Sequence, residues 1–215
     1  LCNAYFHRDS KVPAIMKELK DFHLNIVTSL FPLNAPVYKH LEELFINLEN
    51  ILASESSLCY DYEYDRIICF GELISTTIIS DYMEMEGIEN QFIDIRKFLK
   101  TDQNYRNANI DLELSEQLCK EAFDFNTSST FVTQGFIAGT RTNQTTTLGR
   151  EGSDYTAALL ANLLNAENVT IWKDVPGVMN ADPKEYEKAQ VISRMSYKEA
   201  IELSHFGAKV IHPKI

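Results

Sequence analysis

The stretch "TTTLGREGSDYTAALLA", residues 145–161, decides the fold class of this chain. Three threonines lead into a loop with two glycines, and a run rich in alanine and leucine follows. The glycines allow the backbone to come close to a ligand, and we expect Ser153 to cap the helix that follows. The amides that begin such a helix attract anions through their N–H groups and the helix dipole. The loop therefore predicts an anion site, although Glu151 and Asp154 would repel an anion unless a cation lies between.

Short β-rich runs lie on both sides of this loop and its helix. "TFVTQGFIAG" (130–139) precedes them and "NVTIWKD" (168–174) follows, and a further helix is predicted within "SYKEAIELSHFGAK" (196–209), where a Ser-x-x-Glu capping box marks its start. Strand, helix and strand at this spacing indicate a parallel sheet with crossover helices. We therefore predict one α/β domain over residues 1–215, with its ligands at the carboxyl ends of the strands.

The first half of the chain has a more helical pattern. Apolar residues recur at helical spacing in two segments separated by a proline-bounded turn, and again before the β-rich part. The predicted helices cover roughly residues 15–30, 37–52 and 114–125. Residues 54–65 are predicted as a polar connection and residues 91–95 as a short strand. The run "RIICFGELIST" (66–76) is too short to assign by its period, so helix and strand both remain open there.

Acidic side chains outnumber basic ones, and the formal net charge is −11 at pH 7. Nucleic-acid affinity rests largely on Lys and Arg, so this composition argues against a nucleic-acid partner. The whole acidic excess lies in residues 1–125, because residues 126–215 hold nine acidic and nine basic side chains. A small anion would therefore be repelled least by the second half of the chain.

The four cysteines form no C-x-x-C pair and have no histidine cluster nearby. A zinc site and a disulfide framework are both disfavoured, and we predict free, buried thiols in the cytoplasm. No apolar stretch reaches the roughly 18 residues of a membrane span and no signal peptide opens the chain, so no membrane partner is expected. The chain begins with Leu1 and ends at Ile215 without a helix stop or turn. We expect it to be a piece of a longer protein.

The residues that could carry chemistry fall into four clusters. They are "FGE" (70–72), "GREGSD" (149–154), "WKDVPGVMNADPK" (172–184) and "FGAKVIHP" (206–213). A P-loop and a G-x-G-x-x-G fingerprint are absent, the histidines lack metal spacing, and no Ser, His and Asp set indicates a nucleophile. Each cluster alone has an ordinary structural explanation as a cap, a turn or a surface lysine. Their combination and order are more specific.

Together with "DIRKFLKTD" (94–102), these clusters resemble the consecutive signatures of aspartate kinases, within the amino-acid kinase family, over roughly residues 10–215. The resemblance implies a three-layer α/β/α sandwich with a mainly parallel sheet, incomplete in this chain. It also implies transfer of the γ-phosphoryl of ATP, with Mg²⁺, to the side-chain carboxylate of L-aspartate. That reaction starts the route to lysine, threonine and methionine. A homodimer is expected for the full-length protein.

The resemblance also implies roles for individual residues. Glu72 matches the carboxylate that receives the amino group of aspartate, and Asp154 matches the carboxylate that orients the catalytic lysines. Lys209 would neutralise charge on the transferring phosphoryl group. The residues that would grip the substrate carboxylate are Arg150, Glu151, Gly152 and Ser153. The residues that would contact the nucleotide are Lys173, Asp174, Met179, Lys184, Lys209 and Val210. No protein-held metal is expected.

The sequence departs from the family pattern in several places. The "KFGGTS" strand that opens the family's domain, the Ser/Thr turn of the next strand and the C-terminal ACT domains do not occur in these residues. The family commonly has Thr at Lys173, Tyr at Met179, Arg at Lys184 and Gly at Glu151. Because half of the phosphate-gripping machinery would come from the opening strands, we expect the chain alone to be inactive or nearly so.

Two other classes of function stay open at this stage. One is another kinase of the same family, acting on glutamate or a nucleoside monophosphate. The "FGE" cluster and the length of the helical part before it favour aspartate. The other is a non-catalytic relative that binds small molecules, against which Arg150, Asp154 and Lys209 argue. A scaffolding role explains none of the four clusters.

Overall fold

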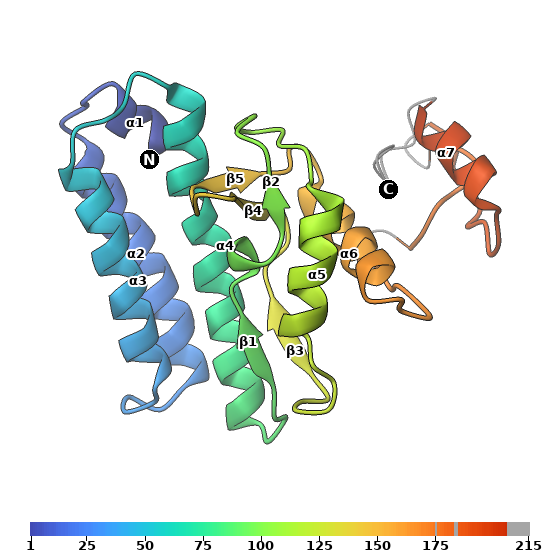
Figure 1. Ribbon diagram of the computed structural model, residues 1–215, viewed down its shortest axis with the longest axis horizontal. Helices are drawn as coiled ribbons and strands as arrows, with labels where there is room; N and C mark the ends of the chain where they lie inside the picture. The colour runs from blue at the N-terminus through green and yellow to red at the C-terminus, as the bar shows by residue number, and fades with distance from the viewer. Residues whose placement is uncertain (175, 183–184, 206–215) are drawn as a thin grey trace.

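The computed structural model describes residues 1–174, 176–182 and 185–205, and its elements follow one another as Figure 1 shows. The helices are α1 (Cys2–Phe6), α2 (Val12–Leu30), α3 (Val37–Ala53), α4 (Tyr60–Met85), α5 (Leu112–Ala122), α6 (Gly152–Leu163) and α7 (Tyr197–His205). The strands are β1 (Gln91–Ile93), β2 (Lys100–Thr101), β3 (Phe131–Thr133), β4 (Ile137–Thr140) and β5 (Thr145–Thr147), and a 3₁₀ turn, η1, covers Ile95–Lys97.

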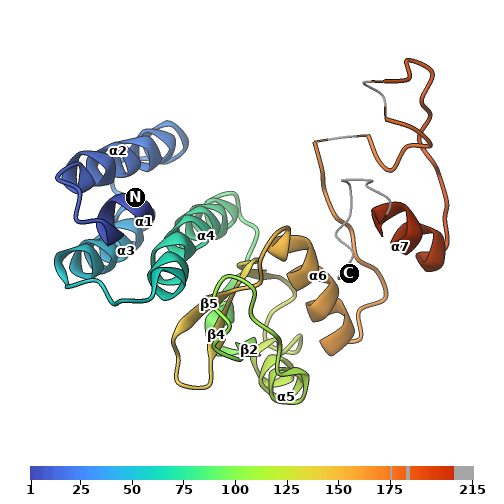
Figure 2. The ribbon, with the colours of Figure 1, turned by 90° about the horizontal axis from the view of Figure 1, so that it is seen from above.

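The strands form a mixed, mainly parallel arrangement. β1 pairs in parallel with β3, β2 pairs in parallel with β4, and β5 returns antiparallel to β4. Helix α5 lies between the paired strands in sequence, as a crossover connection requires. Helix α4 packs on one face of the strands, with α5 and α6 on the other face (Figures 1 and 2). The predicted incomplete α/β fold with a helical layer on each side is therefore confirmed.

Helix α4 resolves the segment that the sequence left open. Residues 66–76 are helical, and the helix already begins at Tyr60, so the predicted polar connection over 54–65 was wrong for its last six residues. The helix contacts α1 and α3 on one side and the strands on the other. Because it is buried on two sides, its sequence lacks the single apolar stripe of a surface helix. Asp61 and Glu63 in its first turn favour the start of the helix through the dipole.

Most other predicted elements agree with the structure. The two amphipathic helices are α2 and α3, the strand at 91–95 is β1, and the helix at 114–125 is α5, which ends at Ala122. The capping box at the start of α7 is confirmed, since the Glu199 carboxylate accepts from the Ser196 amide at 2.7 Å. The cysteine prediction was right for two thiols, Cys69 and Cys119, and wrong for Cys59, which is exposed.

The predicted strand at 168–174 is absent from the part of the chain that the structure describes. Val169 and Trp172 are 47% and 90% exposed, and no strand pairs with this segment there. A β-rich composition forms a strand only when a neighbouring strand supplies hydrogen bonds and covers the apolar face. The chain instead leaves α6 away from the strands (Figure 2).

Gly139 in β4 and Gly71 in α4 provide a matched pair of substitutions. A Cβ on Gly139 would lie 2.3 Å from the Arg96 carbonyl oxygen, whereas a Cβ on Gly71 meets nothing within 4 Å. We expect Gly139→Ala to lower the free energy of unfolding by about 1–3 kcal/mol through overpacking. Gly71→Ala, inside a helix, should raise it by roughly 0.5–1 kcal/mol. Urea denaturation measures both, and equal effects of the two substitutions would contradict the described packing of β4 on Arg96.

Candidate functional site

The loop between β5 and α6 has the backbone of a tight turn. Gly149 has a φ of +83°, and Glu151 has a φ of 52°, which is the left-handed region that non-glycine residues seldom adopt. The Gly152 amide donates to the Gly149 carbonyl at 3.2 Å. Helix α6 begins at Gly152 with Glu151 in the N-cap position and no side chain capping it. The predicted cap by Ser153 was therefore wrong, because Ser153 lies inside the first turn.

The start of α6 is seated against the connection between β3 and β4. A Cβ on Gly152 would lie 2.9 Å from the Phe136 ring, and a Cβ on Gly135 would lie 2.8 Å from the Ser153 Cα atom. The Phe136 amide donates to the Thr156 hydroxyl at 3.0 Å. Both glycines are thus needed for close approach, and this approach fixes where the first turn of α6 lies relative to the strand ends.

Asp154 and Lys173 form the ion pair of this site. Asp154 is 7% exposed, and its Oδ2 accepts from Lys173 Nζ at 2.5 Å. The pair joins the first turn of α6 to the segment that follows the helix. A charged hydrogen bond of this kind is strong because little water competes for the buried carboxylate. Asp154 therefore holds Lys173, a lysine that the resemblance assigned to the nucleotide and not to catalysis.

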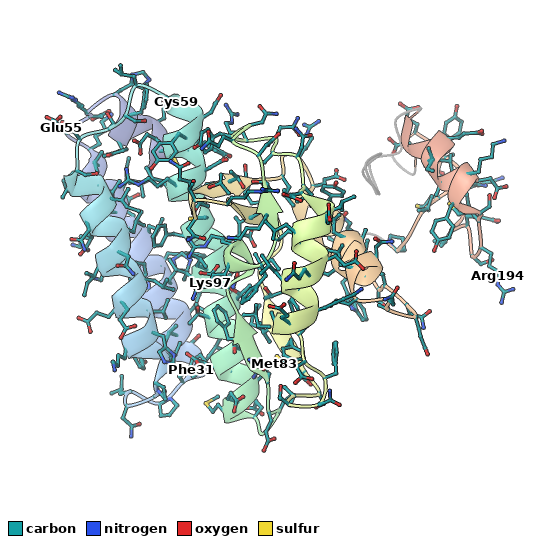
Figure 3. All side chains as sticks on the ribbon, viewed as in Figure 1. Phe31, Glu55, Cys59, Met83, Lys97 and Arg194 are labelled. Atoms are coloured by element: carbon teal, nitrogen blue, oxygen red, sulfur yellow. The ribbon has the colours of Figure 1, made fainter. Side chains whose placement is uncertain are left out.

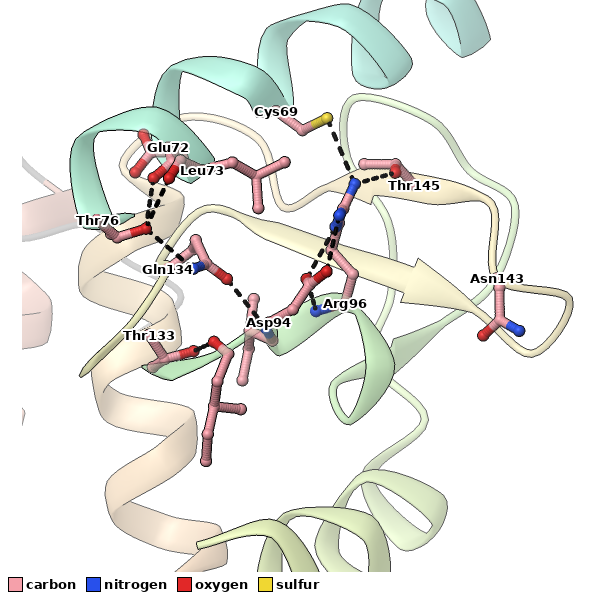
Figure 4. A network of polar contacts seen from close by, with 12 residues as sticks. Cys69, Glu72, Leu73, Thr76, Asp94, Arg96, Thr133, Gln134, Asn143 and Thr145 are labelled. Atoms are coloured by element: carbon pink, nitrogen blue, oxygen red, sulfur yellow. Dashed lines mark hydrogen bonds and ion pairs between the residues drawn. The ribbon is translucent and has the colours of Figure 1, made fainter. Parts of the chain in front are cut away.

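Glu72 lies in the middle of α4. Burial raises the pKa of its carboxyl group above the usual range. The neighbouring Thr76 hydroxyl donates to the Glu72 carbonyl at 2.7 Å and accepts from the Gln134 side chain at 2.9 Å (Figure 4). Gln134 is fully buried and also accepts from the Ile95 amide at 3.0 Å. It ties the turn of α4 that carries Glu72 to the strand connection that contacts α6.

Arg150 and Glu151, which are predicted to bind the substrate carboxylate, differ in their exposure to solvent. Arg150 is exposed in the loop between β5 and α6. The Oε2 atom of Glu151 is buried and has no hydrogen-bond partner among the described residues. A buried carboxylate oxygen without a donor is costly, so it favours a ligand that brings a donor or a cation.

The predicted nucleotide contacts are brought together only in part. Lys173 reaches the site through Asp154. Met179 pairs with Val191 in an isolated antiparallel bridge, and Asp174 is exposed. Within residues 1–174, 176–182 and 185–205, no hydrogen bond or ion pair joins Asp174 or Met179 to α6. The predicted residues that lie outside the described part are Lys184, Lys209 and Val210.

Sequence reasoning missed Asp65 and Gln134. Both are fully buried polar side chains that hold the segments next to the site. A signal for Asp65 was present, because it lies seven residues before Glu72, which places the two on one face of a helix. The signal could be used only once residues 60–85 were known to form one helix. Gln134 carries no comparable signal, since an isolated polar residue in a β-rich run has many explanations.

The described part of the chain has neither a cluster of metal-binding side chains nor a membrane-spanning helix. No group of three or more His, Cys, Asp and Glu side chains there is placed to hold a metal ion. None of the described helices combines the length and the apolar character that crossing a bilayer requires. The cations and carboxylates around α6 therefore form the strongest candidate site among these residues.

Comparison with known proteins shows the family of this chain. The model of the "Amino acid kinase family" matches residues 10–215. The chain belongs to the amino acid kinase family. Family members of known name include lysine-sensitive aspartokinase 3 of Escherichia coli (strain K12), which is 39% identical over 176 residues that make up 80% of this chain. Bifunctional aspartokinase/homoserine dehydrogenase 1, chloroplastic, of Zea mays is 32% identical over 220 residues and matches 100% of this chain.

Solved structures of the amino acid kinase family have the same fold. E. coli aspartokinase III in complex with aspartate and ADP (R-state) matches 93% of this chain with a TM-score of 0.84 and 32% identity. The aspartate kinase of Clostridium acetobutylicum matches 99% of the chain with a TM-score of 0.73 and 27% identity. The chain spans 44% of each of these structures. It spans 39% of the curated E. coli relative and 24% of the maize relative.

Proposed function

We propose that this chain is the catalytic region of an aspartate kinase, which transfers the γ-phosphoryl group of ATP to the side-chain carboxylate of L-aspartate. One observation carries the proposal most directly, namely the buried Asp154 that holds Lys173 beside the loop of Arg150. The names of the relatives support aspartate as the acceptor. A structural relative that was solved with aspartate and ADP supports the pairing of substrates.

Arg150 and Glu72 would bind aspartate. The Arg150 guanidinium suits a carboxylate because its N–H groups can donate in parallel to both oxygens. Glu72 would receive the ammonium group, and Glu151 and the first-turn residues of α6 would complete the grip. A cation near Glu72 would return the pKa of its carboxyl toward the usual range, since it favours the ionised form.

Lys173 would face the phosphates of ATP, with its position fixed by Asp154. The unpaired amides of the helix start add a positive field that favours negative charge. The roles of Asp174, Met179, Lys184, Lys209 and Val210 at the nucleotide remain sequence-based predictions. The cations and exposed loop backbone fit a nucleotide, and Mg²⁺, bound mainly by the phosphates and water, would supply further neutralisation of charge.

The reaction then requires positioning more than covalent help. A side-chain oxygen of aspartate forms the new bond to the γ-phosphorus, and the bond from that phosphorus to the β,γ-bridging oxygen breaks. ADP takes the leaving electron pair, and aspartyl 4-phosphate is the product. Both reactants are anions, so the cations at the start of α6 would reduce their repulsion while the carboxylates orient those cations.

We also propose that residues 1–215 form one truncated kinase domain of a longer protein, with a homodimer as the expected state of that protein and the cytoplasm as its location. The chain would have little or no activity by itself. The catalytic partner of Lys209 would be a lysine of the family's opening strand.

An ATP-turnover assay with a panel of acceptors tests the function. The full-length protein should release ADP with aspartate and form its acyl phosphate, which hydroxylamine traps as the hydroxamate. Glutamate and a nucleoside monophosphate should support little turnover. The 215-residue chain alone should be at least ~100-fold slower, because part of the positioning is lost. Preferred use of another acceptor would refute the aspartate assignment, and full activity of the chain alone would refute its predicted inactivity.

A further inference from the structure

Asp65 is a fully buried carboxylate for which the proposed reaction has no use. It is 0% exposed and lies in the second turn of α4. The nearby guanidinium of Arg106 donates to Asp61 instead, at 2.9 Å, and stacks on Tyr64 with 4.7 Å between its central carbon and the ring centre. A buried carboxylate costs several kcal/mol in lost hydration unless other groups replace the water. The groups that do so indicate what Asp65 is for.

Three hydrogen bonds replace that water, and they come from two separate segments. The Arg106 amide donates to Oδ2 of Asp65 at 2.8 Å, and the Thr147 amide donates to the same oxygen at 2.9 Å. The Thr147 hydroxyl donates to Oδ1 at 2.7 Å. Burial raises the pKa of the Asp65 carboxyl, and these hydrogen bonds oppose the rise. One side chain of α4 thus joins the end of β5 to the loop around residue 106.

These two segments, the end of β5 and the loop around residue 106, lie on either side of the loop at 148–151, which carries Arg150. Thr147 is the last residue of β5 and lies three residues before Arg150. The loop around residue 106 is in close contact with Gly149, because a Cβ on Gly149 would lie 3.2 Å from the Arg106 carbonyl oxygen and 3.0 Å from the Asn107 side-chain oxygen. The Ala108 amide donates to the Thr147 carbonyl at 3.0 Å, which connects the two segments directly. The position of Gly149 therefore depends on the contacts that Asp65 makes.

The other end of β5 is fastened to α4 as well. Arg96 donates to the Thr145 hydroxyl at 3.2 Å and contacts the Cys69 sulfur, while its ion pair with Asp94 at 2.7 Å fixes the guanidinium (Figure 4). With both ends held, β5 cannot slide along α4. What remains for Asp65 to determine is the direction in which the chain leaves the strand toward Arg150.

We propose that Asp65 is a positioning residue, which sets the course of the loop at 148–151 and thereby places the Arg150 guanidinium for the carboxylate of the acceptor substrate. This inference rests on the proposed function, in which Arg150 binds that carboxylate. Asp65 acts through the backbone and does not touch substrate.

The test uses Asp65→Asn in the full-length protein. Asparagine keeps the size but removes the negative charge, so its oxygen accepts more weakly from the Arg106 and Thr147 amides. Its NH₂ group then faces the Thr147 hydroxyl, which has to turn from donor to acceptor, and the loop is held less firmly. We expect the KM for aspartate to rise ~10–100-fold, with a smaller change in kcat and a KM for ATP within about twofold of the wild type. Thr147→Val, which removes one of the three hydrogen bonds at constant shape, should raise the KM for aspartate severalfold in the same direction.

Ser80→Ala is the matched control on the same helix. The buried Ser80 hydroxyl donates to Asn90 at 2.6 Å. Ser80 lies near the Met83 end of α4, whereas Asp65 lies near the Cys59 end (Figure 3). Ser80→Ala should lower thermal stability and leave both KM values unchanged.

Three results would overturn the inference. They are an unchanged KM for aspartate in a folded Asp65→Asn protein, an equal rise in the KM values for aspartate and ATP, and a rise with Ser80→Ala that matches the one with Asp65→Asn. If Asp65→Asn does not fold by circular dichroism, an unchanged KM with Thr147→Val overturns it. The acceptor panel with the wild-type protein tests the proposed function independently of these variants. If the wild type prefers another acceptor in the panel, the KM for that acceptor is measured in all the variants.

Discussion

Arg150→Ala in the full-length protein is expected to raise the KM for aspartate about 100-fold or more while the KM for ATP changes little, because a paired guanidinium–carboxylate contact is worth roughly 3 kcal/mol in a partly desolvated site. Arg150 is exposed in the loop between β5 and α6, so its removal should leave folding intact. Steady-state kinetics with each substrate varied in turn measures the effect.

Two variants sharpen this prediction. Arg150→Lys keeps the charge but loses the parallel pair of donors, so it should recover only part of the affinity. Arg141→Ala removes another exposed arginine, which lies in the hairpin between β4 and β5 and forms an ion pair with Asp111 at the start of α5. It should leave both KM values near the wild type. If Arg141→Ala weakens aspartate binding as much as Arg150→Ala does, general electrostatic attraction explains the affinity better than a specific contact.

Asp154→Asn is expected to lower kcat by about 100-fold or more, because Lys173 loses the buried carboxylate that fixes its ammonium group. Lys173→Met should produce a loss of similar size. If the two residues act as one unit, the double variant should be little slower than either single variant. Single-turnover measurements at saturating substrates separate this loss from weaker binding.

The control for this prediction is an exposed ion pair. Glu116 and Lys120 pair on the surface of α5, four residues apart, and Glu116→Gln should leave kcat unchanged. Multiplicative losses in the Asp154 and Lys173 double variant would show that the two residues act independently. In that case Lys173 serves the nucleotide without help from Asp154.

The sequence predicted the fold where a local pattern was sufficient. The helices α2 and α3 each bury one apolar stripe, so their 3.6-residue period was visible. The presence of α6 followed from the glycine loop, and a mainly parallel sheet followed from the alternation of element types. The parallel pairs are β1–β3 and β2–β4, however, and not strands on either side of α6. Helix α4 could not be assigned, because it lies between two layers and its buried residues face both. The segment at 168–174 was assigned wrongly, because a strand depends on neighbours that its own sequence does not specify.

The sequence predicted which residues belong to the candidate site better than it predicted which of them contact one another. The loop residues 150–154 were assigned from the motif, and the structure brings Asp154 and Lys173 together. Which lysine Asp154 would hold did not follow from the sequence, because 19 residues separate the two. The left-handed backbone at Glu151 and the three donors of Asp65 are likewise products of tertiary packing.

Helix α4 has a consequence for how this protein can vary in length. Asp65 and Glu72 lie on one face of this helix, two turns apart, and in the proposed roles both serve the same site. An α-helix turns about 100° with each residue. A one-residue insertion or deletion between them would rotate one carboxylate away from the strands and toward the α2–α3 hairpin. Length changes at 54–58, just before the helix, cause no such rotation. We therefore expect a library of single-residue insertions to be tolerated before Tyr60 and rejected between Asp65 and Glu72.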